Sequence, residues 1–371
     1  MSTSSTFLPS FLELKETEEY GRGVYSVKEL SPGTDVIVGD PLAHVISSHE
    51  REMYCHHCLK KERSLKKCGQ CKFVWYCSRA CQREDWLYHK VECAGISRIS
   101  PSIPTDTVRL IVRLLVRRSN GTSTVTSLPK GAQWDMDILT THAPRYNEEL
   151  KQSIGEQVFG AKLLMSDSKE YNPEVAFSIA CKMISNSFSI LDWEMNSIGS
   201  GVYILPALLN HSCDPNVIAL FEGPKMRLRT TKKIFENEQL FVSYTDLLET
   251  RERRQRHLQK YYLFSCNCPR CSSEFSGSLD EKLIKTAADL KESDRKTLYK
   301  DGFSKLDEAE NVKKKGDWAA LESLASEYLT KHSSRLGDTN ILIVKMRECL
   351  MDSYIEQQKW REALQVAVTL K

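Results

Sequence analysis

Alternation of apolar and polar residues predicts a β-sheet built from two separated parts of the chain. Residues 7–46 contain short apolar runs bounded by turn formers, at 11–14, 20–25 and 36–38. Further runs rich in branched and aromatic residues lie at 202–204, 217–221, 226–229 and 240–244. Short runs separated by turns favour an antiparallel sheet, which resumes here after a long insertion.

Helical spacing dominates the insertion between these two parts. Residues 108–115 repeat apolar side chains with the period of an amphipathic helix, and helix signals continue to about residue 190. Residues 119–131 are rich in turn formers and are expected to form a loop. The insertion is therefore predicted to be mainly helical.

The chain beyond Cys271 is also helical in pattern and lacks a strand signal. Trp318 and Trp360 recur there at an interval of 42 residues, each just before an apolar helical run. This spacing favours paired helices of the tetratricopeptide type.

Composition places the protein among globular chains. Its 371 residues, 41% of them hydrophobic, can form two or three domains with a sizeable core. The sequence has no signal-peptide pattern at its start and no run of 18 apolar residues, so neither secretion nor membrane spanning is indicated. Thirteen cysteines without such signals are expected to remain thiols, in the cytoplasm and nucleus, and to bind metal rather than form disulfides.

The charge distribution gives only weak support for nucleic-acid binding. The net charge is +3, but residues 51–93 hold ten Lys or Arg against five Asp or Glu. Such an excess suits either an acidic partner or a solvated face, and we favour the solvated face.

A block of cysteines at residues 55–93 carries the clearest chemical signal. Four consecutive ligand pairs supply enough donors for two tetrahedral zinc ions with no position left for water, which indicates structural metal. The pairs are Cys55 and Cys58, Cys68 and Cys71, Cys77 and Cys81, and His89 and Cys93.

The spacing of this block, with the aromatic residues at 73–76 and 86–88, closely resembles the MYND zinc finger. The resemblance implies two interleaved sites: Cys55, Cys58, Cys77 and Cys81 form one, and Cys68, Cys71, His89 and Cys93 form the other. With both sites filled, we expect His56 and His57 to lie at the surface.

The run Asn210-His211-Ser212-Cys213-Asp214-Pro215-Asn216 resembles the signature of SET-domain methyltransferases. A Gly-x-Gly pair at Gly21 and Gly23 precedes it, and residues 238–244 and a second cysteine cluster follow it, in the order of that family. With a MYND finger inserted, the chain resembles the SET-and-MYND (SMYD) lysine methyltransferases.

The resemblance implies an α+β fold, with a mostly antiparallel SET domain split by the finger and a helical insertion. The expected parts are the N-terminal SET segment (1–48), the MYND finger (49–95), the helical insertion (96–198), the core SET segment (199–246), a post-SET zinc segment (247–275) and a helical, tetratricopeptide-like domain (276–371).

The resemblance also implies an activity, the transfer of methyl groups from S-adenosylmethionine to lysine side chains of histone or other proteins. Pro-rich peptides are further candidate partners at the finger, and we expect a monomer. Two other hypotheses remain open: an adaptor whose SET fold is catalytically idle, and a nucleic-acid binder working through the basic finger.

Tyr244 is the expected catalytic residue, because the matching tyrosine lies at the methyl-transfer pore. Phe188, Tyr244 and Tyr262 are expected to form an aromatic channel, since aromatic faces accept an ammonium group and desolvation lowers the pKa of lysine from about 10.4. The residues that the resemblance assigns to the cofactor are Tyr20, Gly21, Arg22, Gly23, His142, Asn186, Asn210, His211, Tyr244, Tyr262 and Phe264.

A third zinc site is expected near the end of the SET region. Cys266, Cys268 and Cys271 supply three ligands, and Cys213 in the signature is the natural fourth. Two positions depart from the family pattern: Asn237 stands where relatives usually have glycine, and Tyr20 where a basic residue is common.

Overall fold

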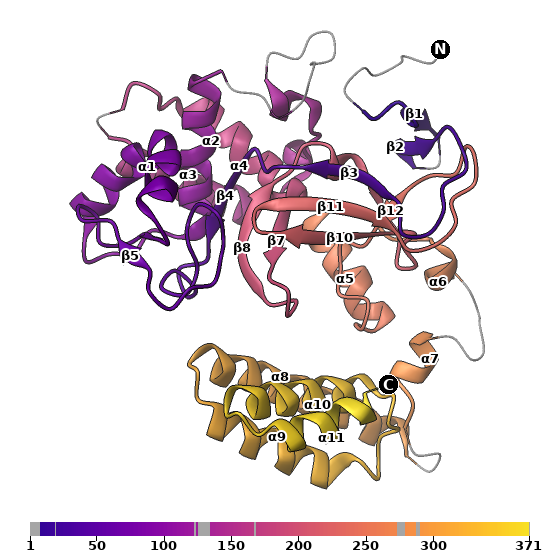
Figure 1. The fold of residues 1–371 in the computed structure, drawn as a ribbon. Helices are drawn as coiled ribbons and strands as arrows, with labels where there is room; N and C mark the ends of the chain where they lie inside the picture. The colour runs from indigo at the N-terminus through magenta and orange to yellow at the C-terminus, as the bar shows by residue number, and fades with distance from the viewer. Residues whose placement is uncertain are drawn as a thin grey trace. The chain divides into compact units, whose positions relative to one another are not determined.

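The computed structural model describes residues 8–18, 20–121, 124, 134–166, 168–272, 279–286 and 290–370. The chain forms two compact units (Figure 1). The first comprises Met1–Tyr244 with Gln259–Phe264, and the second Thr245–Leu258 with Ser265–Lys371. Among the described residues, no helix combines the length and apolarity required to cross a bilayer.

The strands of the first unit pair the N-terminal segment with the segment that follows the insertion. Every pairing is antiparallel except the parallel contact of β9 with β12. The sheets are β1–β2, β10–β11–β3, β4–β8–β7, β9–β12 and β5–β6. The strands are β1 (Leu12–Thr17), β2 (Gly21–Ser26), β3 (Asp35–Gly39), β4 (Ala43–Ile46), β5 (Lys66–Lys67), β6 (Trp75–Tyr76), β7 (Ser187–Leu191), β8 (Ser197–Val202), β9 (Asn210–His211), β10 (Val217–Glu222), β11 (Lys225–Thr230) and β12 (Phe241–Val242). The predicted resumption of the sheet is confirmed.

Four helices lie together beside these strands, and α2 is the central one (Figure 1). They are α1 (Arg79–Ile99), α2 (Asp106–Ser119), α3 (Glu148–Leu164) and α4 (Pro173–Asn186), with 3-10 turns η1 (Asp135–Ile138), η2 (Ala143–Arg145) and η3 (Pro206–Leu208). Thr105 caps α2 by accepting a hydrogen bond from the backbone of Val108. Because α2 packs against α1, α3, α4, β4 and β8, its residues from Val108 to Val116 are all buried.

The second unit is helical and has its own apolar core, which includes Leu306, Ala325, Leu342 and Met346. Its helices are α5 (Arg251–Tyr261), which continues into the first unit, and α6 (Pro269–Ser272), α7 (Leu279–Leu283), α8 (Glu292–Lys314), α9 (Trp318–His332), α10 (Ile341–Glu356) and α11 (Trp360–Thr369).

The two tryptophans of the predicted repeat occupy equivalent places in this unit. Trp318 begins α9 and Trp360 begins α11, and in each case the residue two positions earlier, Gly316 or Gln358, has positive φ. Helices α8 and α9, and α10 and α11, are consecutive and in contact. Paired helices are therefore confirmed, while their tetratricopeptide type stays a prediction.

The α+β fold class is confirmed, with corrections at element ends. Helix α4 ends at Asn186, and the next five residues form β7 because they pair with β8, so the helix does not continue to residue 190. The predicted strand at 202–204 ends at Val202, and only Phe241 and Val242 of the run 240–244 are paired as a strand. Most of the loop predicted at 119–131 lies outside the described residues.

Candidate zinc centres and active site

Eight ligands of the cysteine block gather into two groups. Cys55, Cys58, Cys77 and Cys81 form the first, and Cys68, Cys71, His89 and Cys93 form the second. In each group the ligand atoms all lie within 4.8 Å of one another. The structure therefore brings together the two interleaved sets that the MYND resemblance implies.

The separations within each set fit a tetrahedral metal. The Cys58 and Cys77 sulfurs are 3.7 Å apart, as are those of Cys68 and Cys93, and Cys71 Sγ lies 3.6 Å from His89 Nε2. A zinc–sulfur bond of about 2.3 Å places two tetrahedral ligands about 3.8 Å apart. Four soft or borderline donors at this spacing can hold one zinc ion in each set, so the finger contains two zinc centres.

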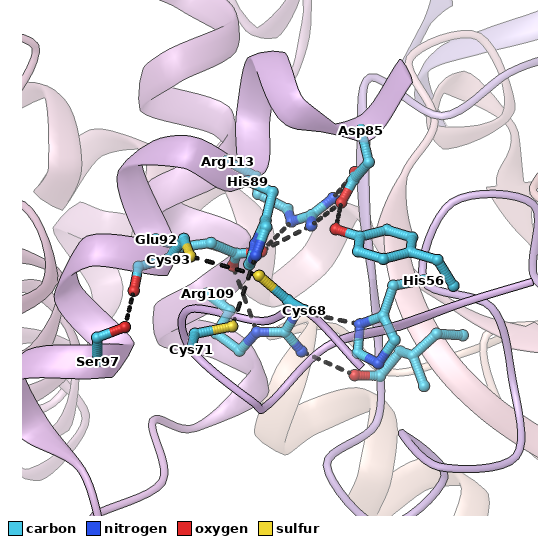
Figure 2. Close-up of polar contacts among 12 residues, drawn as sticks. His56, Cys68, Cys71, Asp85, His89, Glu92, Cys93, Ser97, Arg109 and Arg113 are labelled. Atoms are coloured by element: carbon cyan, nitrogen blue, oxygen red, sulfur yellow. Dashed lines mark hydrogen bonds and ion pairs between the residues drawn. The ribbon is translucent and has the colours of Figure 1, made fainter. Parts of the chain in front are cut away.

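His89 is oriented by a carboxylate on its own helix. Its Nε2 faces Cys71, and its Nδ1 lies 3.0 Å from Glu92 Oε1 (Figure 2). Both side chains are completely buried. A carboxylate on the second ring nitrogen selects the tautomer whose Nε2 lone pair can bind metal.

Two arginines of α2 neutralise the buried acidic groups of α1. Arg113 donates to both oxygens of Asp85, at 2.8 and 3.0 Å, and to Glu92 at 2.7 Å. Arg109 Nε lies 3.3 Å from the other Glu92 oxygen, and Tyr76 donates its hydroxyl hydrogen to Asp85 at 2.7 Å. Although burial opposes their ionisation, Arg113 holds the pKa values of Asp85 and Glu92 below their usual range, and Arg109 adds to the effect at Glu92.

Asp85, His89 and Glu92 also lie close enough together to suggest a metal site of their own. The geometry argues against this, because His89 Nε2 already belongs to the Cys68 set and Arg113 binds both carboxylates. The group is instead the polar surrounding of the second zinc site.

The expected surface position of His56 is wrong. Its side chain is only 1% exposed, Nδ1 lies 3.5 Å from Arg109 Nη2, and Nε2 lies 3.3 Å from the Arg51 carbonyl. Burial and the two arginines of α2 hold its pKa well below the usual value, so it is a neutral part of the core. His57 is half-buried and lies 2.8 Å from Glu84.

Three further cysteines come together within the second unit. The sulfurs of Cys266, Cys268 and Cys271 are buried and lie within 4.8 Å of one another. Cys213 is buried in the first unit, with Sγ 3.2 Å from His211 Nε2.

The SET signature is linked directly to the Gly-x-Gly segment. Asn210 donates from Nδ2 to the carbonyls of Tyr20, at 3.2 Å, and Arg22, at 2.9 Å. Asn216, at the other end of the signature, binds the Gln239 carbonyl and the Phe241 amide at 2.9 and 2.8 Å. Two asparagines therefore hold the signature against β2 and β12 of the SET region.

Tyr244 lies in a cluster of aromatic rings. Its ring stacks on Tyr262 with centroids 4.7 Å apart, its amide donates to His211 Nδ1 at 2.9 Å, and its hydroxyl donates to the Leu209 carbonyl at 2.5 Å. The Phe264 ring packs against the ring of His211, with the two centroids 6.0 Å apart. Burial and the neighbouring Tyr262 raise the pKa of Tyr244 above its usual range, so its hydroxyl remains neutral.

The segment around His142 is tied to the same region. Arg22 donates to the Ile138 carbonyl at 2.6 Å, Asn186 to the Thr140 carbonyl at 3.0 Å, and Arg145 to the Leu263 carbonyl at 2.9 Å. His142 itself is half-buried and precedes a 3-10 turn rather than lying on a helix face.

Phe188 occupies a different setting from the tyrosine pair. It lies on β7 and packs edge-on against Tyr203, with ring centroids 5.9 Å apart. Tyr203 in turn donates its hydroxyl hydrogen to the Pro224 carbonyl at 2.6 Å. The role of Phe188 in a lysine channel stays a prediction.

The structure explains the two glycines and one departure from the family pattern. A Cβ on Gly23 would lie 2.1 Å from Gln239 Nε2, so its lack of a side chain permits close packing within the protein, whereas Gly21 is needed for its φ of +61°. Asn237 has a φ of 64°, and asparagine tolerates this left-handed region better than most residues. The replacement of glycine therefore preserves the turn.

Sequence reasoning missed the polar groups that surround the second zinc site, and it assigned no separate role to Asn216 of the signature. Arg109, Arg113 and Arg117 repeat every four residues through the apolar stretch that begins at Val108. A basic stripe on a helix flanked by apolar residues was the available signal, and Glu92 three residues after His89 was a second one.

Residues 55–93 match the family model described as the MYND finger. The chain is 30% identical over 355 residues to the Mus musculus histone-lysine N-methyltransferase SMYD3, covering 94% of this chain and 79% of the relative. It is 27% identical over 358 residues to the Xenopus laevis N-lysine methyltransferase SMYD2-A, covering 96% of this chain and 83% of the relative. A crystal structure of the SET domain of LSMT bound to lysine and AdoHcy is similar at 13% identity and a TM-score of 0.39, covering 98% of this chain and 90% of that one.

The similarity to SMYD3 extends through the finger, the split SET region and the helical end, and the finger lies where the motif order requires. The chain belongs to the SMYD family of lysine methyltransferases.

Proposed function

We propose that this protein transfers the methyl group of S-adenosylmethionine to lysine side chains of other proteins. One observation carries the proposal: the Gly-x-Gly segment, Asn210-His211, and the stacked Tyr244 and Tyr262 are linked by direct contacts. The named lysine methyltransferases similar over nearly the whole chain support it.

The cofactor would be held by the segments that meet around Asn210. Residues Tyr20 to Gly23, Asn210 and His211 would bind it through backbone and side-chain polar groups, while Tyr262 and Phe264 would supply apolar surface. Contacts of Arg22, Asn186 and Arg145 with residues 138–140 and 263 bring His142 into the same group of segments. When bound, S-adenosylmethionine supplies a methyl group made electrophilic by a positively charged sulfur.

Tyr244 would orient the acceptor amine. Its hydroxyl is neutral and donates to the Leu209 carbonyl, so it does not act as a phenolate base. The aromatic surroundings of Tyr244 and Tyr262 would desolvate the incoming lysine, lower its pKa and favour the neutral nucleophile. Holding the nitrogen in line with the donor methyl removes much of the orientational cost of the reaction.

We also propose a third zinc ion, bound by Cys266, Cys268 and Cys271. Three sulfurs within 4.8 Å leave a tetrahedral zinc one ligand short, and the sequence expectation assigns Cys213 as the fourth. This ion would be structural.

The wider biological setting is part of the same proposal. Histones and cytosolic proteins with accessible lysines are the candidate substrates, and Pro-rich peptides are candidate partners of the finger. We expect a monomer acting in the cytoplasm and nucleus, with nucleic acid a minor partner at most.

Transfer of tritium from labelled S-adenosylmethionine to a mixture of histones and cytosolic proteins tests the activity. The proposal expects label in protein with the unmodified chain and strong loss of label with Tyr244→Phe. Absence of label with folded, zinc-loaded protein would contradict it and favour the adaptor. DNA binding that is steeply salt-dependent and lost on chelation would instead support the nucleic-acid hypothesis.

A further inference from the structure

Four ionised side chains are buried where α1 meets α2. Asp85 and Glu92 come from α1, and Arg109 and Arg113 from α2 (Figure 2). None of the four is more than 3% exposed. Removing an ion from water costs several kcal/mol, so such a group is stable only when every member is paired. Two carboxylates and two guanidiniums make the cluster neutral as a whole.

Glu92 is the point at which this cluster reaches the metal ligands. One of its oxygens accepts from Arg113 and faces His89 Nδ1, while the other faces Arg109. The direction of the His89 ring is thus set by a carboxylate whose own position is set by two side chains of α2. Helix α2 itself contributes no ligand to either set in the finger.

Among the described residues, Glu92 orients no ligand of the first zinc site, which meets this cluster only through Tyr76 and His56, the neighbours of Cys77 and Cys55. The four ligands of the first site are cysteines, three of them only half-buried, whereas every ligand of the second site is buried. The two sites therefore provide an internal comparison within one small module.

We propose that Glu92 is a positioning residue for the zinc ligand His89, and that Arg109 and Arg113 make the metal affinity of the second finger site depend on helix α2. Zinc binding at Cys68, Cys71, His89 and Cys93 and the docking of the finger on α2 are then thermodynamically coupled, so that each stabilises the other. The first site has no ligand bound by Glu92 and meets the cluster only through Tyr76 and His56, the neighbours of Cys77 and Cys55, so its metal affinity depends on α2 less.

The test uses the full chain loaded with ¹¹³Cd, because a site with three sulfurs and one nitrogen gives an NMR resonance distinct from sites with four sulfurs. A chelator titration follows each resonance in the unmodified chain, Glu92→Gln and Arg113→Lys. Glu84→Gln, an exposed carboxylate on α1, and Arg118→Lys, an exposed residue of α2, are the matched controls.

Glu92→Gln is expected to lose the Cys3His resonance at a chelator concentration about 10- to 100-fold lower than the unmodified chain, as is typical when a carboxylate partner of a metal-bound histidine is removed. Arg113→Lys, which weakens the hold on Glu92, should change this concentration in the same direction by a smaller factor. The chelator concentration that removes the four-sulfur resonances should change much less in the test variants, and neither control should change the chelator concentration for any resonance. Folded test variants that keep the Cys3His resonance to the same chelator concentration as the unmodified chain would overturn the proposal.

If the variants do not fold, hydrogen exchange on the unmodified chain tests the same coupling between α2 and the Cys3His site. Amides of α2 from Arg109 to Leu115 should lose protection at the chelator concentration that removes the Cys3His metal. Protection of α2 that persists after that metal has left would overturn the proposal.

Discussion

The junction of the finger with α2 and the cluster around Tyr244 are both buried, yet they use opposite chemistry. At the junction, Asp85 and Glu92 are ionised and each is bound by Arg113. Around Tyr244 the packed side chains are mainly aromatic, and burial keeps the pKa values of Tyr244 and Tyr262 above their usual range, although the nearby Arg22 opposes this at Tyr244. Paired charge serves assembly where no reaction occurs, and a mainly aromatic surrounding is kept for the place where an amine must lose its proton.

Metal removal should produce the largest difference between the two regions. Because zinc contributes on the order of 10 kcal/mol per site in small fingers, a strong chelator should unfold the finger. Circular dichroism and hydrogen exchange should show loss of structure in residues 55–93, reversed by added zinc. A finger that stays protected after complete metal loss would show that its core is sufficient without metal.

Arg113→Met should be the most damaging single substitution at the junction. It leaves Asp85 without its bidentate partner and removes one of the two arginines bound to Glu92, and breaking a buried ion pair in this way costs about 3–5 kcal/mol. Urea unfolding measures the change. Arg118→Met, on the exposed side of α2, is the control and should change stability by less than about 0.5 kcal/mol. Equal losses of unfolding free energy for the two substitutions would contradict the special role of the buried Arg113.

Tyr244→Phe should affect activity much more than stability. Loss of one oriented donor in an active site costs about 10²- to 10³-fold in kcat, whereas loss of its hydrogen bond to Leu209 costs only about 1 kcal/mol of folding free energy. Steady-state kinetics and thermal unfolding separate the two quantities. Tyr171→Phe, which removes a hydroxyl bound to the Val158 carbonyl, is the matched control and should leave kcat unchanged.

Gly23→Ala should have a moderate effect that is confined to the active-site region. The new methyl group would meet Gln239 and Asn210, and displacing them costs about 1–3 kcal/mol. We expect weaker binding of S-adenosylmethionine by calorimetry, because Asn210 holds the Gly-x-Gly segment. Gly39→Ala, where a Cβ meets nothing within 4 Å, should bind the cofactor normally. Unchanged binding by Gly23→Ala would argue against this placement of the cofactor.

The finger and the junction differ in how far sequence could predict them. Zinc ligands lie close together in the chain and obey fixed spacings, so both sets of four could be grouped from the resemblance before any coordinates. The burial of Arg113 could not be predicted, because a polar residue on an amphipathic helix is expected to face solvent unless its partner is known. Its partner Asp85 lies 28 positions earlier, and no local pattern links them.

Contacts between distant parts of the sequence were also unpredictable in the cofactor region and around His56. Asn210 was assigned to the signature from the sequence, but the carbonyls that it binds lie 188 and 190 residues away. His56 was misplaced because local polarity carries no information about α2 packing over it. Asn237 was noted as a departure from the family pattern, and its positive φ shows that asparagine meets the backbone requirement there.

Mass spectrometry of candidate proteins incubated with S-adenosylmethionine tests the central claim most directly. The account predicts added methyl mass on lysine residues with the unmodified chain, and no such addition beyond background with Tyr244→Phe at equal zinc content. Lysine methylation of equal extent by both proteins would contradict the role of Tyr244, and its absence with both would contradict the enzymatic function itself.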